Sequence, residues 1–316
     1  MFQHTIKKSI ECMGVGLHSG RTVNLTLRPA PENTGIVFCL RQGDGGRFFS
    51  LSPRIVVDTG LATTIGLGQE RISTVEHLLA AIRGLDIDNI QIELDGREVP
   101  IMDGSAVPFI MLLHSAGLRE QRAPRQALAI RRPFSFAQDD KWIKASPYHG
   151  FRVDYSINFP HPRVGEQFLS LEITADNFIN ALAKARTFGF LKDVEMLKRN
   201  GLAQGGSLEN AVVLDEYNVL NPEGLRFEDE FVRHKILDFV GDMALIGLPL
   251  RGLFEVRCSG HALNNAFLRA LEENQDHYME RVLLGGENRE TEELVGLSGF
   301  DSLPAYIPVQ VGSAVI

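Results

Sequence analysis

Hydrophobic residues recur at every second position near the N-terminus and at helical spacing further along the chain. Alternation predicts strands, whereas apolar residues three and four positions apart predict amphipathic helices. In the first half, three strands are followed by a helix, a strand and a helix, at residues 5–12, 22–27, 35–40, 73–84, 90–94 and 107–116. Ser105 is the expected N-cap of the last helix, which Gly117 ends.

The second half repeats this plan. Strands are predicted at residues 127–130, 142–145, 151–159 and 253–258. Helices are predicted at residues 175–185, 231–246 and 261–284. A polar stretch at residues 121–125, containing Pro124, separates the halves. A length of 316 residues also favours two domains, at roughly 150 residues per domain. We therefore expect domains at 1–122 and 126–284 and a C-terminal tail at 285–316.

The composition is that of an ordinary globular protein, with 44% hydrophobic and 23% charged residues. A net charge of −8 without a Lys/Arg cluster argues against a nucleic-acid partner. The sequence has neither a signal-peptide pattern nor an apolar run long enough for a transmembrane segment. Cys12, Cys39 and Cys258 are scattered, without the spacing of a disulfide framework or a thiolate zinc site. We expect a cytoplasmic, monomeric protein.

His234 and Asp238 lie four residues apart in a predicted helix, so their side chains share one face. With His77, in the first helix of the other half, they would supply three metal ligands, the number that a catalytic zinc site commonly takes from the protein. The alternative is a solvated polar face, because Asp242 continues the same row opposite an apolar side. Spacing alone does not decide between the two.

Glu76 precedes His77 and also has two interpretations. Ser73 and Glu76 have the spacing of a capping box, in which the glutamate closes a helix N-terminus. Alternatively, Glu76 lies beside the metal and takes a proton from water as a general base.

His261 follows a predicted strand and begins a predicted helix. A helix N-terminus disfavours a protonated imidazole, so a general acid at this position needs an anionic neighbour. Asp242 is the candidate, because a nearby carboxylate raises the pKa of a histidine. The alternative is a neutral histidine bonded to the backbone.

Five segments resemble the UDP-3-O-acyl-N-acetylglucosamine deacetylase family, the zinc amidases that commit Gram-negative bacteria to lipid A synthesis. They occur in the family's order, at residues 73–78 (STVEHL), 101–106 (IMDGSA), 185–190 (ARTFGF), 224–235 (GLRFEDEFVRHK) and 259–265 (SGHALNN). The resemblance runs from about residue 5 to about residue 284. It implies hydrolysis of the substrate's N-acetyl group with release of acetate.

The resemblance implies an α+β fold of two similarly built domains, each a helix layer on a β-sheet. The two helix layers would pack together with the metal between them. It assigns His77, His234 and Asp238 as the zinc ligands, although this donor set also admits ferrous iron.

The same resemblance assigns the reacting groups. Glu76 would be the general base and His261 the general acid, kept charged by Asp242. Thr187 would stabilise the developing oxyanion, and Lys235 would contact the substrate beside the metal.

The remaining assignments concern substrate binding. The resemblance places Phe159 at the nucleotide and Phe188 and Gly189 at the substrate. An insert at residues 190–213, hereafter the insert, would form an apolar tunnel for the acyl chain. Its expected lining is Leu191, Val194, Ala203, Leu208, Ala211 and Val213, although apolar residues at helical spacing are also ordinary core.

Two other functions are compatible with these residues. One is an amidase acting on another N-acyl sugar, and the other is a metal-stabilised protein that binds nucleotide sugars without catalysis. The presence of both Glu76 and His261 disfavours the second. Some members of the family that this chain resembles carry a cysteine near the metal, whereas residues 61–64 of this sequence contain none, so the resemblance does not imply an inhibitory second metal held by a thiol here.

Overall fold

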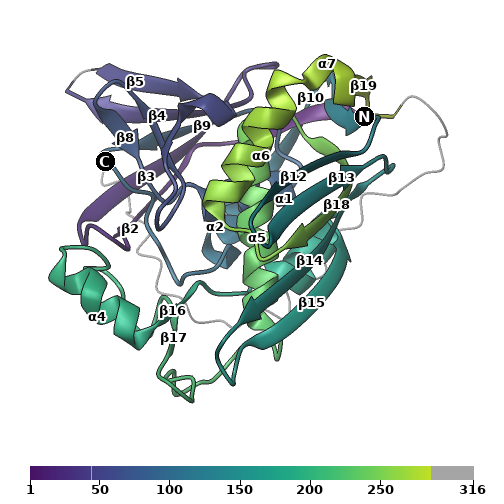
Figure 1. Ribbon diagram of the computed structural model, residues 1–316. Helices are drawn as coiled ribbons and strands as arrows, with labels where there is room; N and C mark the ends of the chain where they lie inside the picture. Colours follow the sequence, from purple (N-terminus) through teal and green to yellow (C-terminus); the bar gives the residue numbers. More distant parts are fainter. Residues whose placement is uncertain (44, 286–316) are drawn as a thin grey trace.

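The computed structural model describes residues 1–43 and 45–285, which form a mixed α+β fold (Figure 1). The five-stranded sheet of the first half lies on one side of a central group of helices, and the seven-stranded sheet of the second half lies on the other. Buried apolar side chains from both halves form one connected core. The expected α+β class is therefore confirmed. The predicted tail lies almost entirely outside the described residues.

The first sheet has the strand order β2-β3-β9-β4-β5. Its strands are β2 (Ile10–Val15), β3 (Thr22–Pro29), β4 (Ile36–Gln42), β5 (Gly45–Ser50) and β9 (Ile90–Leu94). β9 runs parallel to β4, and the other neighbours are antiparallel. Ile90, Ile92 and Leu94 are fully buried on one face of β9, which is the alternation that predicted this strand.

The second sheet repeats the first. Its strands are β11 (Gln126–Ile130), β12 (Phe134–Gln138), β13 (Lys141–Ser146), β14 (Phe151–Phe159), β15 (Gly165–Glu172), β18 (Leu250–Arg257) and β19 (Met279–Leu283). Five of them run in the order β12-β13-β18-β14-β15, in which only the β18–β14 pair is parallel, while β18 also pairs in parallel with β11, and β11 pairs antiparallel with β19. This order and these directions match β2-β3-β9-β4-β5. The structure thus confirms that the halves are similarly built.

In each half, one helix precedes the central strand in the sequence and another follows it. The central strands are β9 and β18. The long helices are α1 (Glu76–Gly84), α2 (Val107–Ala116), α5 (Glu230–Met243) and α6 (His261–Glu273). α1 packs extensively on α5, α2 contacts α1, and α6 contacts α5. The helices of the two halves therefore meet at the α1–α5 contact, which is visible in the centre of Figure 1.

Shorter elements complete the fold. They are β1 (Phe2–Ile6), paired with β10 (Leu118–Pro124); the hairpin strands β6 (Val56–Asp58), β7 (Thr64–Leu67) and β8 (Glu70–Ile72); α3 (Ala175–Asn177); α7 (Gln275–Tyr278); 3-10 turns at Pro53–Ile55 and Ala244–Ile246; and a π-helical turn at Phe178–Leu182. The insert runs from the end of β16 (Phe188–Phe190) through α4 (Leu191–Arg199) and the loop after it into β17 (Val212–Leu214), which is parallel to β16.

Three predicted elements differ in the structure. The strand expected at 5–12 is two strands, β1 and β2, which join different sheets. The helix expected at 175–185 begins as the short α3 and continues as a π-helical turn. The helix expected at 261–284 ends at Glu273, and β19 pairs antiparallel with β11.

The polar stretch at residues 121–125 lies mostly in β10, which pairs with β1. The domain bounds 1–122 and 126–284 remain a prediction. Across residues 1–43 and 45–285, no helix has the length and apolar character needed to cross a membrane.

Candidate active site

His77, His234 and Asp238 converge at the contact between α1 and α5. One donor atom of each side chain lies within 4.8 Å of the others, and all three residues are buried. Asp238 Oδ1 is 3.5 Å from His77 Nε2 and 3.3 Å from His234 Nε2. The two imidazole rings meet edge to face. The structure therefore brings together the three ligands expected from the sequence.

The hydrogen bonds around these donors suit a metal ion. His234 Nδ1 lies 3.1 Å from the Ala185 carbonyl, an arrangement that puts the ring proton on Nδ1 and leaves Nε2 free to ligate. Lys235 Nζ donates to Asp238 Oδ2 at 2.9 Å. Asp238 Oδ1, by contrast, is buried without a hydrogen-bond partner among the described residues. A bound cation would satisfy this carboxylate oxygen.

The charge states also match those of ligands. Burial lowers the pKa of His234 to about 3, so the imidazole is neutral at neutral pH. Burial acts to raise the pKa of Asp238, but the facing imidazoles and the Lys235 ammonium hold it well below its usual range. A neutral imidazole and an ionised carboxylate are the forms that bind metals.

Glu76 lies close to His77 and Asp238, two of the expected ligands, in the first turn of α1, and is 3% exposed. Its Oε2 accepts a hydrogen bond from the backbone of Thr63, and its Oε1 is 3.8 Å from His261 Nε2. The capping-box interpretation is wrong, because α1 begins at Glu76 and Ser73 pairs with residues outside the helix. Burial raises the pKa of Glu76, which increases its affinity for a proton.

His261 begins α6 and faces two carboxylates. Its Nδ1 is 2.8 Å from Asp242 Oδ2, and its Nε2 points toward Glu76. Burial alone would lower the pKa of His261, but Asp242, aided by Glu76, raises it to about 10. The alternative of a neutral, backbone-bonded histidine is therefore not what the structure contains.

Asp242 is held by more partners than the sequence indicated. Its Oδ1 accepts a hydrogen bond from the Thr63 hydroxyl at 2.6 Å, and its Oδ2 accepts another from Asn264 at 2.8 Å. Thr63 also reaches Glu76 through its backbone N–H. The sequence reasoning missed Thr63 and Asn264. Only the position of Asn264 within the SGHALNN segment hinted at a role.

The chain matches the family model for UDP-3-O-acyl N-acetylglycosamine deacetylase over residues 3–273. It is 61% identical over 284 residues to the UDP-3-O-acyl-N-acetylglucosamine deacetylase of Nitratidesulfovibrio vulgaris, covering 90% of this chain and 92% of the relative. The enzyme of the same name from Oleidesulfovibrio alaskensis is 57% identical over 309 residues, 98% of this chain and 99% of that protein.

The chain belongs to the UDP-3-O-acyl N-acetylglycosamine deacetylase family. The Myxococcus xanthus relative, at 49% identity over 310 residues, spans 97% of both chains. Membership makes the chain a hydrolase that acts on an N-acetyl group and confirms the family resemblance seen in the sequence.

The resemblance singled out two further residues, Thr187 and Lys235, and of these Lys235 contacts the metal-binding group, which consists of His77, His234 and Asp238. The segment before β16 carries Thr187, whose backbone N–H donates to the Gly104 carbonyl of the first half. The Lys235 ammonium lies 5.6 Å from the centre of the Phe188 ring, in addition to its contact with Asp238. The segment that carries Thr187 and Phe188 thus approaches α5 at the Phe188 ring.

Aromatic side chains connect this region to the insert. The Phe159 ring packs edge-on against the Phe188 ring, with 5.6 Å between the ring centres, and its centre lies 6.1 Å from that of the Phe190 ring. A cavity of 420 Å³ next to them is lined by Phe190, by Leu191 and other residues of α4, and by residues at or just after the ends of β14 and β17. Of the expected acyl-chain residues, Leu191 lines it, whereas the others, Val194, Ala203, Leu208, Ala211 and Val213, do not.

The remaining residues of the insert have mixed burial. Ala203 and Val213 are buried, Val194 and Ala211 are half-buried, and Leu208 is exposed. The insert also reaches the first half, because Gly205 N–H donates to the Leu17 carbonyl. Gly189 lies in β16 and is half-buried.

Proposed function

We propose that this chain hydrolyses the N-acetyl group of UDP-3-O-[(R)-3-hydroxyacyl]-N-acetylglucosamine, releasing acetate and the UDP-3-O-acyl-glucosamine that lipid A synthesis requires. The observation that carries the proposal is the convergence of His77, His234 and Asp238 beside Glu76 and His261. Three ligands flanked by two proton carriers suit amide hydrolysis.

Zinc is the proposed metal, held by His77 Nε2, His234 Nε2 and Asp238 Oδ1. Two imidazoles and one carboxylate are a common zinc donor set, and ferrous iron is the alternative to test. When bound, the ion would polarise the acetamide carbonyl and lower the pKa of a water molecule.

Glu76 is proposed as the general base. Its raised pKa suits a carboxylate that must take a proton from the attacking water and release it later. The Thr63 N–H fixes one oxygen of Glu76 and leaves the other facing His261. His261 is proposed as the general acid, because its Nε2 carries a proton at neutral pH and the departing amine needs one.

Thr187 and Lys235 are proposed to act on the substrate. A threonine hydroxyl can donate to the oxyanion that forms on the acetamide, and such a donor is typically worth about 3 kcal/mol. Lys235 would contact the substrate while its pairing with Asp238 keeps it beside the metal. Phe159, Phe188 and Gly189 are proposed to contact the sugar nucleotide, with Phe159 meeting the nucleotide.

The insert is proposed to bind the 3-O-acyl chain along Leu191, Val194, Ala203, Leu208, Ala211 and Val213. Each buried methylene contributes about 0.8 kcal/mol, so the acyl chain would contribute strongly to affinity. The domain bounds 1–122 and 126–284, a monomeric state and a cytoplasmic location remain predictions from the sequence.

Purified chain loaded with zinc should release acetate from the acylated UDP-sugar. A chelator should remove the metal and abolish the rate, and added zinc should restore it. The rate should be at least about tenfold lower when the sugar lacks the 3-O-acyl chain, since chain binding is lost. Acetate is measured by an enzyme-coupled assay and metal content by mass spectrometry. Equal rates on both sugars would favour an amidase for another N-acyl sugar, and binding without acetate release would favour a non-catalytic protein.

Asp242→Asn should move the basic limb of the pH–rate profile to lower pH by about 1 to 3 units. The proposed acid must be protonated, so activity is lost as pH rises through the pKa of His261. Asp242 raises that pKa to about 10 against the opposing effect of burial, and the substitution removes the raising charge. kcat/KM measured against pH tests this.

Asn264→Ala is the matched control for Asp242→Asn, because it removes a neutral hydrogen-bond donor to Asp242 and leaves the carboxylate in place. Its basic limb should stay near that of the wild type. If Asp242→Asn leaves the limb unmoved, another group sets the basic pKa.

A further inference from the structure

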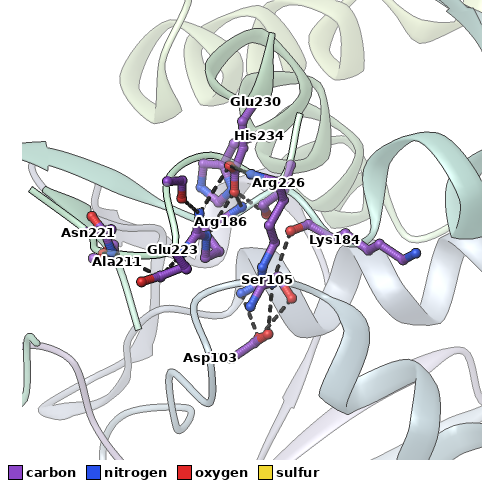
Figure 2. A network of polar contacts seen from close by, with 12 residues as sticks. Asp103, Ser105, Lys184, Arg186, Ala211, Asn221, Glu223, Arg226, Glu230 and His234 are labelled. Atoms are coloured by element: carbon purple, nitrogen blue, oxygen red, sulfur yellow. Dashed lines mark hydrogen bonds and ion pairs between the residues drawn. The ribbon is translucent and has the colours of Figure 1, made fainter. Parts of the chain in front are cut away.

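A fully buried ion pair lies behind the metal-binding group, outside the residues that carry the chemistry. Arg186 is 1% exposed and Glu230 is 0% exposed. Glu230 Oε1 accepts hydrogen bonds from both the backbone N–H and the Nε of Arg186, each at 2.9 Å. Figure 2 shows this pair in a network of polar contacts, with His234 drawn close to Glu230.

Glu230 connects two segments that both serve the site. It lies in the first turn of α5, four residues before His234, so the two side chains project from the same face. Its partner Arg186 lies between Ala185 and Thr187 in the sequence. The Ala185 carbonyl faces His234 Nδ1. α5 is thus attached to the 185–187 segment at two points one helical turn apart.

The pair is further immobilised by its other contacts. Arg186 donates through Nη1 to Glu223 at 2.5 Å and through Nη2 to the Gly224 carbonyl at 2.7 Å. Glu230 Oε2 accepts from the backbone of Arg226 at 2.6 Å. Almost every donor and acceptor of the two charged groups is therefore used, as low-dielectric surroundings require.

The network reaches the first half and the insert. Arg226 Nη1 pairs with Asp103 at 2.9 Å, and the Gly104 carbonyl accepts from the backbone of Thr187 at 2.8 Å. On the other side, Asn221 joins Glu223 to the Ala211 carbonyl, as Figure 2 shows. The 185–187 segment is therefore held from α5, from the first half and from the insert.

A buried ion pair is seldom a means of gaining stability, because the desolvation of both charges offsets their attraction. An apolar pair of similar volume would serve packing equally well. Directional hydrogen bonds to a backbone N–H, however, fix a loop to a helix in one register. Position, rather than stability, is what this pair provides.

We propose that Arg186 and Glu230 are positioning residues, which hold the Ala185 carbonyl against His234 and Thr187 beside the metal-binding group. This inference rests on the proposed metal site. It assigns no chemistry to the pair. Its effect is on the orientation of the His234 imidazole and on the placement of the Thr187 hydroxyl.

Glu230→Gln and Arg186→Lys test the proposal with three measurements. Zinc affinity, measured by competition with a chromogenic chelator, should weaken about tenfold, the lower range for loss of an outer partner of a ligand. In metal-free protein, long-range ¹H–¹⁵N spectra should show one Nδ1–H tautomer of His234 in the wild type and a mixture in the variants. At saturating zinc, kcat should fall about tenfold while KM stays within about twofold.

Asp88→Asn is the matched control. Asp88 pairs with the buried Arg125 at 2.9 Å at the other end of α1, so this variant also weakens a buried ion pair. It should lower Tm yet keep the zinc affinity and the His234 tautomer of the wild type. If Glu230→Gln and Arg186→Lys behave in the same way as Asp88→Asn, the pair is structural only and the proposal is overturned.

Two further outcomes are distinguished. Wild-type chain that neither binds zinc nor releases acetate would refute the proposed function, whereas wild-type binding with unchanged variants refutes only the positioning role. Should both buried variants fail to fold, Glu223→Gln replaces them, because the Glu223 side chain is 54% exposed and still contacts Arg186. A several-fold weaker zinc affinity is then expected, and unchanged affinity overturns the proposal.

Discussion

Glu76→Gln should lower kcat for acetate release by about 10³-fold, within the range of 10² to 10⁴ for loss of a general base. The amide has the shape of the carboxylate and can still accept the hydrogen bond from Thr63. It cannot take a proton from water. Because Glu76 is not one of the three proposed ligands, zinc content should stay at the wild-type value. Steady-state rates and metal content measured on the same samples test both parts.

Glu93→Gln is the control for Glu76→Gln. Glu93 is a half-buried carboxylate of β9 paired with Arg28 and Arg41, away from the metal-binding group. Its substitution should leave kcat near the wild-type value. A Glu76→Gln variant that keeps more than about a third of the wild-type kcat would contradict the general base. Loss of zinc would instead make Glu76 a ligand.

The repeated architecture was largely predictable from the sequence, because its strands and helices carry strong local patterns. β9 and β14 bury alternate residues, and α5 carries apolar residues at helical spacing, so spacing alone located them. The common order of the two sheets was not predictable in the same way. It depends on strand pairs such as β18–β14, whose partners are distant in the sequence.

The errors in secondary structure arise from tertiary partners. The spacing of apolar residues in segment 279–283 is compatible with a helix. In the structure this segment instead forms backbone hydrogen bonds to the edge of β11, and this pairing decides its conformation. Similarly, Ser73 has the spacing of a capping residue, but its backbone bonds to residue 97 and its hydroxyl meets that of Thr64. No local pattern contains either partner.

The metal-binding group was only partly predictable, because local spacing relates two of its residues and a tertiary contact brings in the third. His234 and Asp238 share a helix face by spacing, whereas the approach of His77 depends on how α1 meets α5. Thr63 and Arg186 carry no spacing signal at all. Their roles follow from partners 179 and 44 residues away, Asp242 and Glu230.

The close approach of α1 to α5 depends on Gly241. A Cβ atom at this position would overlap the backbone carbonyl oxygen of Glu76, which cannot move without moving α1. Since His77 is the next residue on α1 and Asp238 lies one turn before Gly241 on α5, a displaced α1 would separate the proposed ligands. The small residue at 241 is therefore a condition for the metal-binding group to form.

Gly241→Ala should consequently lower kcat on the order of 10²-fold, the loss expected from a misplacement of about 1 Å, and should weaken zinc binding in parallel. Overpacking should also destabilise the fold by about 3 kcal/mol. Gly84→Ala is the control. Gly84 is the last residue of α1, far from His77, and a Cβ atom there would meet the ring of Phe178 rather than a backbone atom. That variant should lose stability in urea unfolding but keep zinc affinity, since a side chain can yield where a backbone cannot. If Gly241→Ala binds zinc as tightly as Gly84→Ala does, the helix contact does not set the ligand geometry.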